Sequence, residues 1–237
     1  MGNCCFSFNK KDFQSNSQND DGISQIIASS INKCICKINI QNKTGIKKCT
    51  GFFCHIPEKS IRLLITNSHN IDEHYLNKEN KLIYNEMENE LIKEINLKKD
   101  RYKLIDKQFD FTIIEILQED NINNFLVIND EFYKKNDQIF AYHNVKREKL
   151  KLSLGKIIEK GKNYLKYEIG LKEGSSGSPI ILMKNLKVVG LHKAFLNDNS
   201  NNKLNLGIPI EFIIDKINMS YFNIQNSNVS NVNYLHY

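Results

Sequence analysis

The stretch Gly174-Ser175-Ser176-Gly177-Ser178-Pro179 (GSSGSP) decides how this sequence is interpreted. It follows one short apolar stretch and precedes another, so it is predicted to form a tight turn between two β-strands. A glycine-rich turn of this kind exposes a hydroxyl, here that of Ser176, beside converging backbone N–H groups. The N–H groups of Gly174 and Ser176 are therefore predicted to form an oxyanion hole, which stabilises negative charge on a substrate oxygen.

A serine hydroxyl is a poor nucleophile by itself, so this interpretation requires a histidine base and a group that orients the histidine. Both types of residue occur upstream at strand ends. His69 follows the apolar stretch 63–65, and Asp110 opens the apolar stretch 110–116. The sequence therefore predicts His69 as general base, Asp110 as its orienting carboxylate and Ser176 as nucleophile.

The remaining pattern favours β-structure. Short apolar stretches, often alternating with polar residues, recur along the chain and are separated by turn-forming residues, which is typical of an all-β barrel or sandwich. One helix is expected from Pro209 to Ile217, because its isoleucines recur on one helical face and a proline suits a first helical turn. We expect an N-terminal tail over 1–24, strand-rich halves over 25–120 and 121–217, and a C-terminal tail over 218–237.

Composition sets the broad class. Of the 237 residues, 41% are hydrophobic and 25% charged, as in soluble globular proteins. The net charge of +6 comes from scattered lysines without a basic block, so no nucleic-acid partner is expected. Apolar stretches are too short for a transmembrane helix, and the first 25 residues lack a secretory signal core, which favours the cytoplasm. The six cysteines are expected to be thiols, and their spacing does not favour zinc, so neither metal nor cofactor is expected.

Three segments carry a resemblance to a known family. ITNSHN (65–70), DFTIIEI (110–116) and GSSGSPI (174–180) resemble, in this order, the signature segments of chymotrypsin-like (trypsin-fold) serine proteases. The motif sequences are most similar to those of HtrA-type proteases and bacterial glutamyl endopeptidases, and they also resemble those of the chymotrypsin-like proteases of positive-strand RNA viruses. The resemblance covers residues 34–217. It implies two antiparallel six-stranded β-barrels with a short C-terminal helix, a catalytic cleft between the barrels and a polypeptide substrate.

The resemblance extends to the substrate pocket. Gly190-Leu191-His192 is similar to the segment of glutamyl endopeptidases and viral proteases whose histidine binds a P1 Glu or Gln side chain. Those families have a hydroxyl residue where Leu171 stands, and the residue that gives trypsin its Arg/Lys preference is replaced by Gly170. Basic specificity is therefore not expected. A Glu/Gln preference and an apolar preference both stay open, as does a purely structural role for His192.

Two further features concern activation and the remaining histidines. Ser175 stands where digestive trypsins have an aspartate that pairs with a new N-terminal amine, so the resemblance implies that this zymogen switch is lacking. The other histidines are predicted to be surface residues: His55, His74, His143 and His236.

The N-terminus, Met1-Gly2-Asn3-Cys4-Cys5, resembles that of myristoylated and palmitoylated proteins. Phe6 stands where the pattern has Ser or Thr. One myristoyl chain gives only marginal membrane binding, of order 10⁴ M⁻¹, so Cys4 and Cys5 matter as a second anchor. Acylation of Gly2, Cys4 and Cys5 is expected to place the protein at the cytoplasmic face of a membrane, and an unmodified end is the alternative.

A rival function is a catalytically silent relative that acts as a peptide-binding or membrane-anchored scaffold. The intact set of His69, Asp110 and Ser176 argues against it, because such relatives commonly lose one of these residues.

Overall fold

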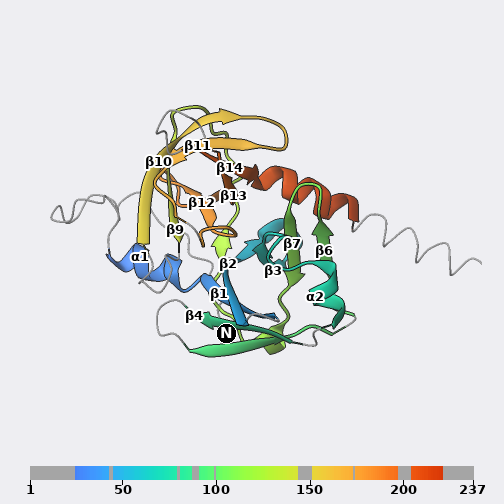
Figure 1. Ribbon diagram of the computed structural model, residues 1–237. Helices are drawn as coiled ribbons and strands as arrows, with labels where there is room; N and C mark the ends of the chain where they lie inside the picture. Colours follow the sequence, from blue (N-terminus) through green and yellow to red (C-terminus); the bar gives the residue numbers. More distant parts are fainter. Residues whose placement is uncertain are drawn as a thin grey trace, which may run out of the picture.

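The computed structural model describes residues 25–42, 45–78, 81–86, 91–98, 100–143, 151–172, 174–196 and 204–220. In Figure 1 two units of β-structure lie one above the other, with little helix around them. This confirms the predicted all-β class. Gly2, Cys4, Cys5 and His236 lie outside the described residues, as do the predicted N-terminal tail and residues 221–237 of the C-terminal tail.

The first unit is a curled sheet of eight strands. Their order is β5-β4-β1-β2-β3-β7-β6, and β8 pairs with β2 off this path. Among the described residues the sheet curls without closing, so the two-barrel fold is present with one barrel open. The strands are β1 (Ile35–Asn42), β2 (Gly45–Ile56), β3 (Ile61–Thr66), β4 (Lys81–Glu86), β5 (Ile92–Asn96), β6 (Lys103–Asp106), β7 (Phe111–Glu115) and β8 (Leu126–Val127).

The second unit is a closed barrel in the order β10-β11-β14-β13-β12-β9. Alternation explains its strands: in β11, Leu165, Tyr167 and Ile169 are buried, while Lys166 and Glu168 between them are more exposed. The strands are β9 (Gln138–His143), β10 (Lys151–Lys160), β11 (Leu165–Ile169), β12 (Pro179–Leu182), β13 (Val188–Phe195) and β14 (Leu204–Pro209).

Helices are few and short. α1 (Gln25–Asn32) precedes the first sheet, α2 (Glu73–Lys78) lies between β3 and β4, and 3₁₀ turns cover Pro57–Lys59 and Gln118–Asp120. The expected C-terminal helix is present over 210–220, past its predicted end at Ile217. In the described part of the chain, none of the helices has the length and apolar character to cross a bilayer.

Three hydrophobic cores hold the molecule together. One fills the first sheet around Phe53, Leu64 and Tyr84, and another fills the closed barrel around Tyr167 and Ile180. The third contains side chains from both units, so it joins them across an apolar seam. Its members include Phe52, Leu63 and Phe111 from the first unit and Phe140, Ile181 and Leu191 from the second.

Several elements were not predicted from the sequence, namely helices α1 and α2 and strands β4, β5, β6, β8 and β14. The first sheet also extends past the predicted boundary at residue 120, because β8 pairs with β2. Directly after it, Ile128 forms a bridge with Val188 of the second unit. The division of the chain at residue 120 stays a prediction.

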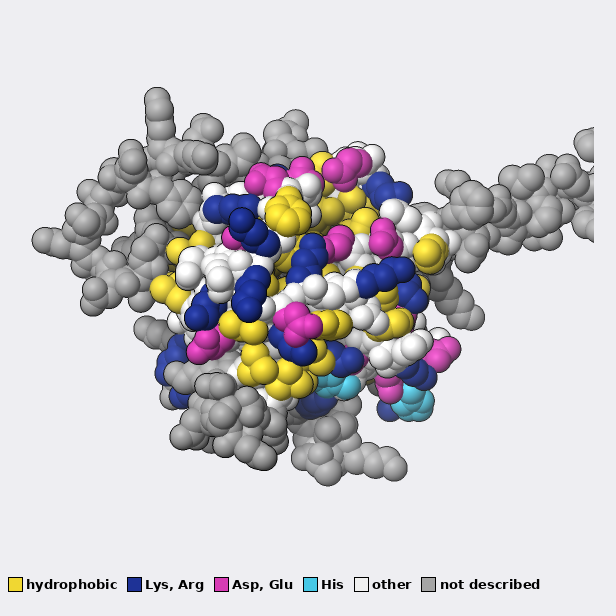
Figure 2. Space-filling model, turned by 90° about the horizontal axis from the view of Figure 1, so that it is seen from above, with side chains coloured by type: hydrophobic (Ala, Val, Ile, Leu, Met, Phe, Trp, Pro, Cys, Tyr) yellow, Lys and Arg dark blue, Asp and Glu magenta, His cyan; other side chains and the backbone are white. Residues whose placement is uncertain are grey.

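Surface charge is dispersed. Figure 2 shows basic and acidic side chains intermingled on the face seen from above. Ion pairs join the neighbouring strands β10 and β11, as between Lys166 and Glu159 at 2.7 Å and between Lys156 and Glu168 at 3.7 Å. Exposed pairs of this kind are screened by water and salt, so they contribute little to the free energy of unfolding.

Candidate active site

The loop after β3 binds both the backbone carbonyl and the carboxylate of Asp110 through three successive residues. Asn67 Nδ2 donates to the Asp110 carbonyl at 3.0 Å. Ser68 Oγ and the His69 backbone N–H donate to Asp110 Oδ1 at 3.1 and 3.0 Å. The His69 ring lies against the same carboxylate, with Nδ1 2.8 Å from Oδ2. The segment Asn67-Ser68-His69 therefore fixes Asp110 and orients His69 together.

Asp110 occupies a special backbone position at the tip of the β6–β7 hairpin. Its φ is +70°, in the left-handed region that Asp tolerates better than most residues. Its N–H donates to the Asp106 carbonyl at 2.8 Å, which closes the turn. The C-terminal helix packs on this tip, with the Phe212 ring 4.6 Å from that of Phe109 and Lys216 Nζ 3.3 Å from Asp106 Oδ2.

Electrostatics keep Asp110 ionised. Burial by itself raises the pKa of a carboxyl group, but hydrogen bonds from the His69 ring and backbone, the His69 charge and the Ser68 hydroxyl outweigh it. The pKa of Asp110 therefore lies below its ordinary value. An ionised Asp110 holds the His69 Nδ1 proton, and the His69 side chain is 45% exposed.

The nucleophile turn contains two glycines with positive φ, Gly174 at +96° and Gly177 at +93°. Gly177 N–H donates to the His192 carbonyl at 3.1 Å, and Ser178 N–H donates to the Ser175 carbonyl at 2.9 Å. The N–H groups of Gly174 and Ser176 donate to no described residue. Within the described part of the chain, the turn therefore leaves unpaired the two donors that the sequence assigns to an oxyanion hole.

This turn is docked on the first unit. Thr50 N–H donates to the Ser176 carbonyl at 3.3 Å, and Thr50 Oγ1 donates to the Gly174 carbonyl at 3.0 Å. Asn70 Nδ2 donates to the Ser176 carbonyl at 3.4 Å. Thr50 and Asn70 were not predicted as site residues, although Asn70 is the last residue of the segment ITNSHN (65–70) that carries the resemblance. Through these contacts the structure brings His69, Asp110 and Ser176 to one seam between the units.

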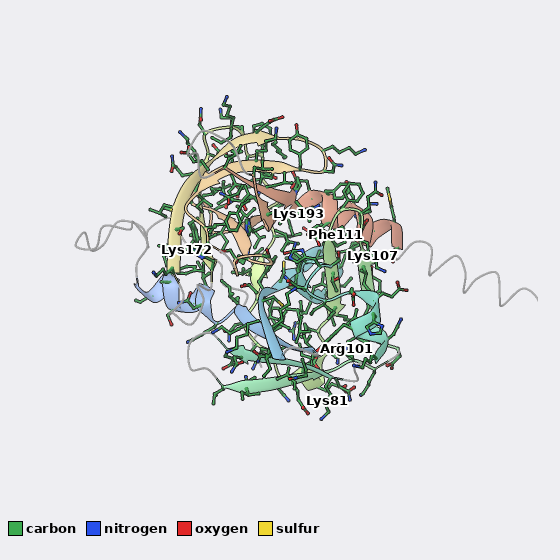
Figure 3. All side chains as sticks on the ribbon, in the orientation of Figure 1. Lys81, Arg101, Lys107, Phe111, Lys172 and Lys193 are labelled. Carbon is green, nitrogen blue, oxygen red and sulfur yellow. The ribbon has the colours of Figure 1, made fainter. Side chains whose placement is uncertain are left out.

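The Ser176 hydroxyl has its own partner. Its Oγ donates to the Lys193 carbonyl at 3.3 Å, and no hydrogen bond joins it to His69, which is also a described residue. Lys193 Nζ in turn donates to the Phe109 carbonyl at 3.4 Å, next to Asp110. Figure 3 shows Lys193 and Phe111 near each other where the two units meet. The long Ser176–Lys193 contact leaves the hydroxyl weakly held.

His192 lies behind the nucleophile turn and is fully buried. Its Nδ1 is hydrogen-bonded to the Tyr167 hydroxyl at 2.5 Å, and its buried Nε2 has no partner among the described residues. The Phe195 ring lies 5.4 Å from the His192 ring. Gly170 follows β11, and Leu171 beside it packs against the barrel core.

The pKa values of Tyr167 and His192 determine which of the two donates in their hydrogen bond. Burial raises the pKa of Tyr167 well above its ordinary value, so the phenol keeps its proton and donates. Burial, together with the nearby His143 and His69, lowers the pKa of His192 to about 3. A neutral ring that accepts at Nδ1 carries its proton on Nε2. His192 therefore presents a buried N–H donor without an acceptor.

The prediction that His143 lies on the surface is wrong. It ends β9, where its ring is 1% exposed and contacts Ser175 and Ser153. No local signal marks this burial, because residue 143 ends an apolar strand and precedes a polar stretch. By contrast, His74 on α2 is exposed as predicted. Across the described residues, no group of three or more His, Cys, Asp or Glu side chains is placed to hold a metal ion.

Comparisons with known proteins agree with this geometry at the level of the fold. Neither a protein-family model nor a curated protein sequence matches the chain. Among solved structures, the serine endoprotease from Yersinia pestis matches with a TM-score of 0.63 at 14% identity, over 81% of this chain and 64% of that chain. The active form of the Rv3671c protease from M. tuberculosis matches with a TM-score of 0.62 at 13% identity, over 79% and 81%.

A viral structure is also similar. The catalytically active tobacco etch virus protease, complexed with product, matches with a TM-score of 0.55 at 16% identity, over 76% of this chain and 74% of that chain. At these identities the likeness establishes the fold, which is that of trypsin-like serine proteases. The chain spans only 64% of the length of the Yersinia structure.

Proposed function

We propose that this chain is a serine endopeptidase that hydrolyses peptide bonds through an acyl-enzyme on Ser176. The observation that carries the proposal is the 2.8 Å contact of His69 Nδ1 with Asp110, beside a turn that presents Ser176 and two N–H groups that donate to no described residue. Acyl transfer requires a base oriented by a carboxylate, a nucleophilic hydroxyl and hydrogen-bond donors for the oxyanion.

The proposed reaction begins with rotation of the Ser176 side chain away from the Lys193 carbonyl. Its Oγ then attacks the scissile carbonyl carbon while its proton passes to His69 Nε2. The carbonyl oxygen becomes an oxyanion that accepts from the N–H groups of Gly174 and Ser176. His69 gives the proton to the leaving amine, the C–N bond breaks, and water releases the acyl group by the same sequence.

A covalent probe tests this proposal. A fluorophosphonate should label the parent protein, and peptide mapping should place the adduct on Ser176. Ser176→Ala should abolish labelling and peptide hydrolysis while leaving the fold intact, because it removes one oxygen atom, and His69→Ala should nearly do so. A parent protein that binds peptides but neither reacts nor turns over would instead support the scaffold alternative.

For specificity, we propose that His192 contacts the substrate's P1 side chain and favours Glu or Gln. Its unpaired buried Nε2–H can donate to a carboxylate or amide oxygen, which an apolar side chain cannot use. The His192 ring is fully buried, with the partly exposed Phe195 ring 5.4 Å away, so side chains around His192 must move before a substrate side chain can reach this donor. Leu171 and Gly170 add no charge to this pocket, so Arg and Lys are disfavoured.

A peptide-library profile of the parent decides between the two P1 preferences. If the parent cleaves after Glu or Gln and His192→Ala lowers kcat/KM for these substrates at least about tenfold, the donor role is supported. A decrease of this size is expected for the loss of one hydrogen bond to a charged group. Cleavage after Phe or Leu in the parent would make His192 a packing residue. A preference for Arg or Lys contradicts both outcomes.

We also propose that acylation at Gly2, with Cys4 and Cys5, anchors the enzyme to the cytoplasmic face of a membrane. The support is the sequence MGNCC, and these residues lie outside the described part of the structure.

A further inference from the structure

A buried chain of hydrogen bonds runs behind the nucleophile turn. Ser175, which precedes the proposed nucleophile, is fully buried, and its Oγ lies 3.1 Å from His143 Nδ1. On the other side of the ring, His143 Nε2 lies 3.0 Å from Ser153 Oγ, which donates to the Gly170 carbonyl at 3.0 Å. We call this chain of hydrogen bonds, formed by Ser175, His143, Ser153 and Gly170, the relay. It connects strands β9 and β10 to Gly170 and Ser175.

Ser175 ties the turn together at the other end of the relay. Its N–H donates to the Lys172 carbonyl at 3.1 Å, and its hydroxyl also donates to that carbonyl. The Lys172 N–H donates back to Ser175 Oγ at 3.2 Å. The orientation of Ser175 thus sets the backbone from which the N–H groups of Gly174 and Ser176 project.

Both serine hydroxyls of the relay face a carbonyl on the side away from His143. The carbonyls of Gly170 and Lys172 can only accept, so Ser153 and Ser175 donate to them, and each serine oxygen can accept from His143. A neutral ring carries one proton, so it donates to one of the two serines at a time.

We propose that His143 is a positioning residue: through Nδ1 it holds Ser175, and with it the oxyanion turn, in the arrangement that acyl transfer needs. This inference rests on the proposed peptidase function. It assigns a role to Ser175, which replaces the aspartate that trypsins pair with an N-terminal amine. A neutral relay anchored inside the barrel takes the place of that ion pair.

Burial and charged neighbours keep the relay neutral at physiological pH. Burial, Lys151 from β10 and Lys172 from the turn together lower the pKa of His143 to about 4, and His192 from β13 also lies within electrostatic range. Protonation would supply the missing proton, because both ring nitrogens would then donate to serine oxygens. The ring therefore donates to Ser153 and Ser175 together only in acid.

The test compares three histidine variants. His143→Gln keeps a donor toward Ser153 but has no atom at the Nδ1 position, whereas His143→Asn keeps a polar atom toward Ser175. His143→Gln should lower kcat at least about tenfold with KM within about twofold, because small displacements of the reacting groups are costly. His143→Asn should recover part of the loss, and His74→Gln, at an exposed histidine, should change neither constant.

A second measurement does not depend on activity. Nitrogen-15 chemical shifts of the His143 ring in the parent should report a neutral ring at pH 7, and Ser175→Ala should shift Nδ1 more than Nε2. An Nδ1 shift that Ser175→Ala leaves unchanged, or parent-like kcat in His143→Gln, would overturn the inference. A neutral ring whose Nδ1 responds to Ser175→Ala, in a parent that no fluorophosphonate labels, would refute the peptidase proposal instead.

Discussion

Gly177→Ala is the sharpest test of how the nucleophile turn is docked on the first unit. An added Cβ at Gly177 would lie 1.9 Å from the Thr50 carbonyl oxygen and 2.8 Å from Thr66 Oγ1. Ordinary contact begins near 3.4 Å, so the turn and β2 would have to separate by about 1.5 Å. That shift would break the hydrogen bonds that Thr50 makes to the turn.

Two costs follow from this geometry. An L side chain at φ +93° costs roughly 1–2 kcal/mol of stability. The displacement acts on function, because a misplacement of about 1 Å typically costs on the order of 10² in rate. We therefore expect Gly177→Ala to lower kcat/KM for a peptide substrate, and the rate of fluorophosphonate labelling, by about 100-fold.

Gly45→Ala is the matched control. Gly45 also has a positive φ, +131°, but an added Cβ there meets nothing within 4 Å. It should show only the backbone cost, roughly 1–2 kcal/mol in urea unfolding, with unchanged labelling kinetics, whereas Gly177→Ala should lose more stability because the Thr50 hydrogen bonds break as well. A Gly177→Ala protein that reacts at the parent rate would refute the argument that close contact with Thr50 sets the position of Ser176.

The remaining predictions address orientation, stability, pH and targeting. Asp110→Asn should keep the fold but lower kcat about 10⁴-fold, because the histidine adopts the wrong tautomer. The corresponding substitution in a chymotrypsin-fold protease has an effect of this size. A parent-like rate would show that Asp110 is not part of the site. Arg101 binds Asp120 through two buried hydrogen bonds, at 2.6 and 2.9 Å, so Arg101→Met should cost about 3–5 kcal/mol in urea unfolding, and a cost below 1 kcal/mol would contradict this.

Burial lowers the pKa of His192 to about 3, so the unfolded chain binds the proton first as pH falls below 6.5. As pH falls from 6 to 4, the free energy of unfolding should therefore decrease in both proteins, with a slope about 1.4 kcal/mol per pH unit steeper in the parent than in His192→Phe. Parallel plots of unfolding free energy against pH would refute the burial argument. Gly2→Ala should move the protein from the membrane to the soluble fraction, whereas an unacylated native N-terminus in mass spectrometry would exclude the anchor.

Much of the fold was predictable because strands with one buried face repeat every second residue. β7, β9, β11 and β12 each coincide closely with an apolar stretch in the sequence. The missed strands β4, β5 and β6 lack a clean alternation of apolar and polar residues, since Ile83 in β4 and Ile92 in β5 are exposed and all of β6 is half-buried. β14 follows a polar stretch, so the burial of all four strands depends on neighbours that are distant in the chain. The short helices α1 and α2 were missed because so few residues carry little periodicity.

By itself, the sequence determined which residues carry the proposed chemistry. Two features are visible in the sequence itself: the order of His69, Asp110 and Ser176, each at the end of an apolar stretch, and the glycines around the serine. A strand ends where its apolar alternation ends, so a polar residue there is expected at a rim. No distance between these residues follows from that pattern.

Only the tertiary structure decided what surrounds them. Burial of His143 and His192, and their hydrogen bonds to Ser175 and Tyr167, join residues 32 and 25 positions apart. The docking of Thr50 on Gly174 spans 124 positions. Such contacts arise when two sheets bury a common apolar seam, because the free energy of that burial depends on the whole packed surface and not on any local stretch.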